Sequence, residues 1–233
     1  MNNLGFQDQL LEELEQEFTW RIVEFKQFEN VLHEKEADSD FCDTYRKALI
    51  IMLYSYYEGY CKSALAMYAE YINKLSLSVK DVTDGLACTS LGSEFNKLLD
   101  SNYKPIDFGD RSIKEDSILQ SFGRRKEFTS RYVPYLSTKI IIPDDVVDTG
   151  SNLWSYVLKK ILFRLDMDFE LVDDYQKEIN ELVNKRNSFA HGERKRAPDN
   201  NEYTDFKGKA LDLMKKIKDI TYEHYCNKKY LKI

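Results

Sequence analysis

The sequence predicts an all-α protein, an antiparallel helical bundle that is interrupted by one irregular insertion. Only 9 Gly and 4 Pro occur among 233 residues, so there is little of the turn chemistry that a many-stranded sheet needs. Apolar residues recur every three or four positions over several long stretches, which is the period of an amphipathic helix. With 42% hydrophobic and 32% charged residues, the composition is that of a globular chain with a sizeable core. We therefore expect a single domain over 1–233.

The first two expected helices are the longest. Over 6–32, apolar residues follow one helical face, while acids and glutamines fill the other. A polar break over 37–40 ends this helix. The next helix is expected over 41–75, and its segment 48–54 is apolar on all sides, as in the central helix of a bundle. Because a short polar loop joins the two helices, we expect them to pack antiparallel.

The insertion is expected over about 76–150, where the apolar period weakens. Short helices are expected near 93–100 and 114–122, and the segment 140–143 is expected to form an extended strip packed on the bundle. No independent apolar repeat emerges here. We therefore interpret the region as an insertion and not as a second domain.

Three further helices complete the expected bundle. The first covers 152–163, where the apolar residues again follow a helical stripe. The second covers 174–191, and Gly192 is well placed to end it. The third covers 203–227.

Charge and cysteine content narrow the function classes. The net charge of -6 argues against a protein that holds nucleic acid through bulk electrostatics, but it is compatible with a local basic groove. The cysteines lack close paired spacing, so the sequence indicates no metal site, redox motif or cofactor. Cys61 lies within an apolar helical run and is expected to be a buried free thiol, which fits a reducing compartment. The cysteines are Cys42, Cys61, Cys88 and Cys226.

The expected location is cytoplasmic, without a membrane partner. The most apolar run, 48–57, is too short to span a bilayer. The first residues of the sequence carry acids among apolar residues, which is unlike a secretory signal.

The helix expected over 174–191 places polar groups on its packing face. Arg186 is three or four residues from members of the apolar stripe, and Asn187 and His191 lie four apart at the edge of the same face. A guanidinium in such a place is costly unless it is paired or faces a cavity. Structural explanations stay open, since His191 could cap the helix end and Arg186 could be an ordinary ion-pair partner. The stripe consists of Ile179, Leu182, Val183 and Ala190.

Glu58 is the acid that we expect to accompany Arg186. It follows Ile51 by seven residues and Tyr54 by four, so it lies along an apolar line of the second helix. An acid in that position should seek a cation. Two roles stay open: Glu58 anchors Arg186, which we favour, or it orients Arg186 toward a phosphate.

These segments resemble the HEPN superfamily, whose motif is an arginine followed after four to six residues by a histidine. The motif in this chain is Arg186-Asn187-Ser188-Phe189-Ala190-His191-Gly192-Glu193. The second helix is similar to the tyrosine-rich helix of the prokaryotic toxin and defence branch, and it reads Tyr54-Ser55-Tyr56-Tyr57-Glu58-Gly59-Tyr60. The stretch from Asn152 into the motif is also similar. The resemblance covers the second helix and 150–193 well, the first helix loosely and 76–149 hardly at all.

The resemblance implies a HEPN-like bundle that forms a homodimer, with two motifs facing one composite cleft. Many members are ribonucleases that act as toxins or in antiviral defence. The implied activity is therefore metal-independent endoribonuclease cleavage, in which the 2′-hydroxyl of RNA is the nucleophile. A toxin also implies an antitoxin or another inhibitory partner.

The residue chemistry fits that activity. An imidazole titrates near neutral pH, so we assign His191 as the acid or base. A guanidinium stays charged and can hold a phosphate with two hydrogen bonds, so we assign Arg186 as the phosphate clamp. Asn187 would orient the substrate or the histidine, and Glu58 would support the site.

Basic residues border the motif and are candidates for RNA binding, although a solvated charge run is an equal alternative. They are Lys185, Arg194, Lys195 and Arg196. For the run 124–126, a solvated face is favoured. We hypothesise that the insertion shapes the RNA cleft or a partner surface. The competing hypothesis is a non-catalytic HEPN module that binds a partner protein or a nucleotide, and a scaffold unrelated to nucleic acid is the third.

Overall fold

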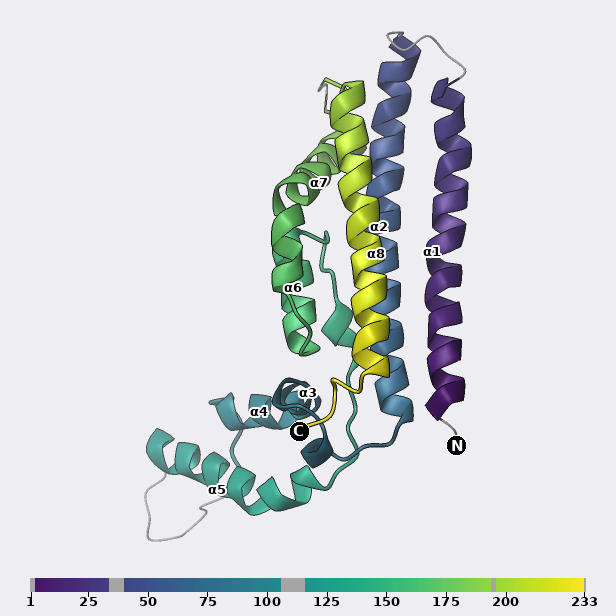
Figure 1. The fold of residues 1–233 in the computed structure, drawn as a ribbon. Coiled ribbons are helices and arrows are strands. Elements are labelled where there is room, and N and C mark those ends of the chain that lie inside the picture. Colours follow the sequence, from purple (N-terminus) through teal and green to yellow (C-terminus); the bar gives the residue numbers. More distant parts are fainter. Residues whose placement is uncertain (1–2, 34–39, 106–115, 194–195, 233) are drawn as a thin grey trace.

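The computed structural model describes residues 3–33, 40–105, 116–193 and 196–232 (Figure 1). These residues form helices and connecting segments with isolated β-bridges but no strand, so the predicted all-α class is confirmed. The α-helices are α1 (Asn3–His33), α2 (Asp40–Lys74), α3 (Asp84–Ser90), α4 (Gly92–Leu99), α5 (Ser117–Leu136), α6 (Ser155–Arg164), α7 (Gln176–Ala190) and α8 (Asn200–Cys226). The 3-10 helices are η1 (Val79–Asp81), η2 (Asp144–Val147) and η3 (Glu170–Tyr175).

The bundle is built around α2, as predicted. α1, α2 and α8 run side by side, and α6 and α7 lie along the flank of α2 and α8 (Figure 1). α1 and α2 are antiparallel. α2 contacts α1, α7 and α8, so its side chains are buried on several sides and the helix lacks a single apolar stripe. Cys61 is a buried free thiol within it. The fully buried tyrosines of α2 are Tyr54, Tyr57, Tyr60, Tyr68 and Tyr71.

Two helices before the motif begin later than the apolar period predicts. α6 starts at Ser155 and not at 152, because Asn152 and Leu153 lie in a bend whose polar groups bond to other helices. α7 starts at Gln176, because the preceding segment forms η3. In both cases a tertiary contact or a tighter turn replaces the first helical turn that local periodicity favours.

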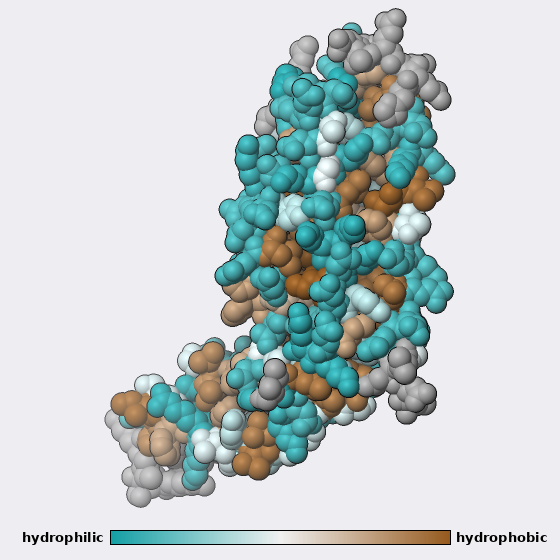
Figure 2. Space-filling model, in the orientation of Figure 1, coloured by the Kyte–Doolittle hydropathy of each residue, from teal (hydrophilic) through white to brown (hydrophobic). Residues whose placement is uncertain are grey.

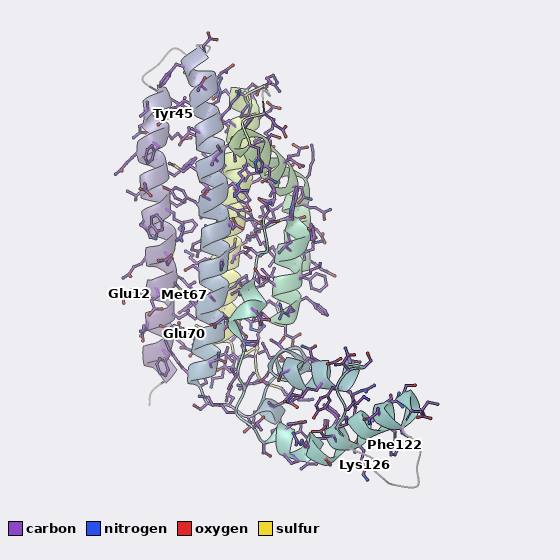
Figure 3. All side chains as sticks on the ribbon, turned by 180° about the vertical axis from the view of Figure 1, so that it is seen from behind. Glu12, Tyr45, Met67, Glu70, Phe122 and Lys126 are labelled. Carbon is purple, nitrogen blue, oxygen red and sulfur yellow. The ribbon has the colours of Figure 1, made fainter. Side chains whose placement is uncertain are left out.

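The described residues between α2 and the 140–142 segment form a lobe at the base of the bundle, where α3, α4 and α5 lie at an angle to the long helices (Figure 1). α4 agrees with the short helix expected near 93–100. α5 starts at Ser117, is capped by the Asp116 carboxylate and continues to Leu136, so it is longer than expected; 114–115 lie outside the described residues. Phe122 and Lys126 project from α5 (Figure 3). That the lobe is an insertion within one domain stays a prediction.

The expected extended strip is present over 140–142. Ile140 and Ile142 are buried, whereas Ile141 between them is exposed. The Asn73 amide at the end of α2 holds the strip, because it accepts from the Ile142 N–H at 2.8 Å and donates to the Ile142 carbonyl at 3.0 Å. The strip therefore joins the lobe to the bundle.

The visible outer surface of the bundle is largely hydrophilic, with apolar residues scattered between the polar ones (Figure 2). Within the described parts of the chain, no helix combines the length and the apolarity needed to cross a bilayer.

Candidate functional site

The site is built on α7, whose inner face packs on the bundle. Ile179, Leu182 and Val183 are buried, as the stripe predicted. Ala190 is exposed, so its assignment to the stripe was wrong: the last turn of α7 extends past the core. Arg186 lies between the buried residues of the stripe and the exposed last turn of α7, and its side chain is half-buried.

Neutral groups hold the Arg186 guanidinium. Its Nη1 donates to Oδ1 of Asn152 at 2.8 Å and to Oδ1 of Asn187 at 2.8 Å. Its central carbon lies 4.6 Å from the centre of the Tyr54 ring, a cation–π contact across α2. Both hydrogen bonds to described residues use Nη1, so Nη2 and Nε, the edge of a guanidinium that suits a bidentate acceptor, bond to none of them.

Tyr54 separates Arg186 from Glu58. The Tyr54 hydroxyl accepts from the Leu153 N–H at 2.8 Å and lies close enough to the Glu58 carboxylate to feel its charge. Burial raises the pKa of this hydroxyl, and the Glu58 charge raises it further, so Tyr54 stays a neutral donor. The expected direct pairing of Glu58 with Arg186 was wrong: among the described residues, no ion pair within 4.0 Å joins them. Glu58 reaches the arginine through Tyr54.

His191 stands at the end of α7 and is exposed. It is the C-cap residue, and its N–H donates to the Asn187 carbonyl at 3.0 Å. The chain then turns at Gly192, whose φ of 71° is in the left-handed region. The N–H groups of Gly192 and Glu193 donate to the carbonyls of Phe189 and Ser188 at 3.2 and 2.9 Å, which is a Schellman motif. This turn presents the imidazole to solvent.

The structure therefore joins some of the predicted site residues and not others. Arg186 and Asn187 are bonded to each other, and Glu58 is connected to Arg186 through Tyr54. The His191 ring makes no hydrogen bond or ion pair with any residue in the described ranges. It lies at the open end of the site.

The basic residues predicted to bind RNA beside the motif are partly paired with acids of the same chain. Nζ of Lys185 is 4.0 Å from a carboxylate oxygen of Glu202, and Arg196 lies 2.8 Å from the other oxygen of that carboxylate. Arg196 also pairs with Asp199 at 3.6 Å. Both acids belong to the capping box that starts α8. Arg194 and Lys195 lie outside the described residues.

In the 124–126 run, Arg124 has a structural environment. Its Nε and Nη1 donate to the carbonyls of Leu98 and Tyr103, each at 3.2 Å. Arg125 and Lys126 are exposed. Arg124 thus ties α5 to the end of α4.

Asn152 and Tyr54 belong to the site, but the sequence did not predict them there. Asn152 was placed at the start of a helix, and Tyr54 was counted as core. Each residue adds one polar group to a mostly apolar segment. Both are too far from Arg186 along the chain for a helical period to relate them to it. The contacts span 34 residues between Asn152 and Arg186 and 99 residues between Tyr54 and Leu153.

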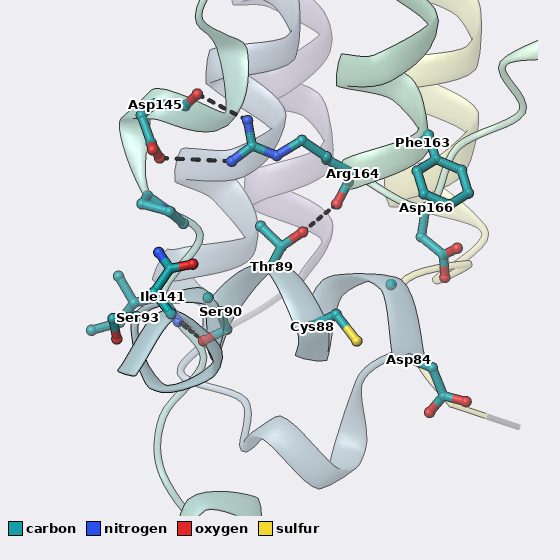
Figure 4. Close-up of a pocket in the computed structure, with 14 residues that line it drawn as sticks. Asp84, Cys88, Thr89, Ser90, Ser93, Ile141, Asp145, Phe163, Arg164 and Asp166 are labelled. Carbon is teal, nitrogen blue, oxygen red and sulfur yellow. Dashed lines mark hydrogen bonds and ion pairs between the residues drawn. The ribbon is translucent and has the colours of Figure 1, made fainter. Parts of the chain in front are cut away.

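Away from the motif, a pocket lies between α3, α4, the 141–145 segment and the end of α6 (Figure 4). Its volume is about 1020 Å³. Arg164 donates to the Asp145 carbonyl at 3.2 Å across one wall, and Thr89 Oγ1 donates to the Arg164 carbonyl at 2.6 Å. These bonds fasten the lobe to the bundle. Within the described segments, no three His, Cys, Asp or Glu side chains are grouped to hold a metal ion.

Comparison with known families gives a match over nearly the whole chain. The sequence matches the HEPN_MAE_28990-like HEPN family model over residues 10–230. No curated protein and no solved structure matches the chain. The matched range includes α2 with Glu58 and Tyr54, the lobe and the motif at the end of α7. The chain is therefore a member of the HEPN superfamily, in the HEPN_MAE_28990-like family.

Proposed function

We propose that this protein is a metal-independent endoribonuclease. The observation that supports the proposal best is the presentation of Arg186. Amide oxygens and an aromatic ring orient the guanidinium without neutralising it, and one edge carrying N–H donors stays available. That edge matches two oxygens of a phosphodiester.

The reaction needs proton transfers and stabilisation of charge. A base takes the proton of the 2′-hydroxyl, whose oxygen attacks the adjacent phosphorus. The bond from phosphorus to the 5′-oxygen breaks, that oxygen takes a proton from an acid, and a 2′,3′-cyclic phosphate remains. Arg186 stabilises the charge on the pentacoordinate phosphate, and Asn187 positions the strand. His191 transfers a proton.

A homodimer would supply both proton-transfer groups. His191 is exposed at the tip of α7, so a second copy packed at this end would bring two imidazoles and two guanidinium groups to one cleft. The acid and the base could then be the same residue from the two copies. A role as a toxin or antiviral-defence effector, with an inhibitory partner, is proposed on the same basis.

The test is cleavage of total RNA and of a labelled oligoribonucleotide in the presence of EDTA. We expect His191→Ala and Arg186→Gln to lower the cleavage rate by about 10²–10⁴-fold, because each removes a group that acts in the transition state. Lys177→Ala, an exposed change in the first turns of α7, should cleave like the wild type. Thermal unfolding and light scattering would check that each variant keeps its fold and its oligomeric state.

A non-catalytic HEPN module that binds a nucleotide or a partner protein is the second candidate. The internal pairing of Lys185 and Arg196 with Glu202 favours it, because it lowers the positive charge offered to RNA. If wild type and His191→Ala are equally inactive on every RNA, with any copurifying inhibitor removed, the ribonuclease proposal is wrong. The binding module then takes its place.

A further inference from the structure

A small pocket lies on α7 beside the motif. It has a volume of about 290 Å³. The α7 residues that line it occupy adjoining positions on one side of the helix, and Arg196 closes it from the segment that precedes α8. The lining residues are Asn184, Lys185, Ser188, Phe189 and Arg196.

The size and the lining suit one flat aromatic ligand. The volume is at the lower end of the roughly 300–1,000 Å³ of small-molecule pockets, which is enough for a single base. Phe189 is half-buried and packs on the core, which makes its ring a rigid stacking surface. The Lys47 ammonium from α2 lies 5.7 Å from the centre of that ring. The exposed Asn184 amide offers a donor and an acceptor to a base edge.

The charges favour a base over a free phosphate. Both cations of the pocket, Lys185 and Arg196, already face the Glu202 carboxylate at 4.0 and 2.8 Å. A phosphate would have to compete with that carboxylate for them. A base would bind by stacking on Phe189 and by hydrogen bonds to the Asn184 amide, so it would not compete with Glu202. Stacking of a base on an aromatic side chain is worth about 1–3 kcal/mol.

The pocket lies on the side of α7 that leads to His191. Asn184 and His191 are seven residues apart, so they lie on the same side of α7, about 10 Å apart along its axis, with Asn187 between them. A strand that places its phosphate beside His191 therefore brings a neighbouring nucleotide over the pocket. We infer that this pocket is a nucleobase subsite that selects the base next to the cleaved phosphodiester. Its place in cleavage rests on the proposed function.

Binding of uncleavable RNA tests the subsite without any need for catalysis. Fluorescence anisotropy would be measured with labelled 2′-O-methyl octamers of A, C, G or U. We expect the wild type to prefer one base, and Phe189→Leu to weaken binding of that octamer by about tenfold, since leucine keeps the packing but loses the stacking. Asn184→Ala should flatten the preference among the four octamers. Lys177→Ala is the matched control on α7, and thermal unfolding would check that every variant is folded.

The outcomes separate this inference from the proposed function. Base-dependent binding that Phe189→Leu weakens supports the subsite even if no RNA is cleaved. If the wild type binds no octamer, or binds all four equally, the subsite is wrong. It is also wrong if RNA is cut with a base preference that neither Asn184→Ala nor Phe189→Leu alters, a result that leaves the ribonuclease proposal intact.

Discussion

At the scale of the residue, the charge of Arg186 is oriented by neutral partners. A carboxylate bonded directly to the guanidinium would compete with a phosphate for the same N–H groups. The amide oxygens of Asn152 and Asn187 and the ring of Tyr54 orient the group but leave its net charge uncompensated. Glu58 acts one step away, because its charge acts on the Tyr54 hydroxyl. This arrangement combines a fixed geometry with an available charge.

Two tyrosines of α2 allow a matched test of this network. Tyr54 and Tyr57 are both fully buried, but only the Tyr54 hydroxyl has hydrogen-bond partners among the described residues. Tyr54→Phe should lower the free energy of unfolding by about 1–3 kcal/mol, because it leaves the buried Leu153 N–H unsatisfied. Tyr57→Phe should be neutral or slightly stabilising. Urea denaturation measures both, and equal losses in the two variants would contradict the network.

At the scale of the element, the end of α7 decides where His191 lies. The Schellman turn through Gly192 satisfies the last carbonyls of the helix and directs the chain away before α8 begins. The motif histidine therefore occupies the last position before the turn, where it is exposed and held by its own backbone bond. The position of the imidazole depends on the backbone of this turn.

Two glycines in different conformations test the turn. Gly192 has a φ of 71°, so Gly192→Ala should lower the free energy of unfolding by about 1–2 kcal/mol. Gly208 is exposed within α8, and a Cβ there would meet no atom within 4 Å. Gly208→Ala should therefore raise the free energy of unfolding by about 0.5–1 kcal/mol. Thermal or urea unfolding gives both values, and a stabilising Gly192→Ala would refute the account of the turn.

At the scale of the whole molecule, a buried histidine joins α2, α8 and the loop after α6. Nδ1 of His224 accepts from the Tyr68 hydroxyl at 2.8 Å, and its Nε2–H donates to the Asp166 carbonyl at 3.2 Å. Asp166 has a φ of 57°, so this bond supports a left-handed residue that is not glycine. Burial lowers the pKa of His224 to about 4, which keeps the ring neutral.

Stability should therefore fall at mildly acid pH. The unfolded histidine has a pKa of about 6.5, above the folded value, so the unfolded chain binds protons more readily below that pH. The contribution of His224 is present above pH 6.5 and decreases as the pH falls toward 4. Between pH 7.5 and 5, the loss should be about 2 kcal/mol.

The measurement is urea unfolding of wild type and His224→Gln across this range. The variant should be less stable at pH 7.5 but should lose less stability on acidification, because its side chain does not titrate. Parallel pH profiles of the two proteins would show that the stability does not depend on protonation of His224.

The sequence by itself determined the helical class, the central place of α2 and the position of Arg186 on the packing face of α7. These properties follow from local periodicity, because a helical face is defined by residues three and four apart. Only the tertiary structure decided what Arg186 contacts, and it replaced Glu58 with Tyr54 and Asn152 as direct partners. It also showed that Glu202 already pairs with Lys185 and Arg196. The physical reason is distance along the chain: these contacts join segments whose relative placement depends on the packing of the whole bundle, which no local period contains.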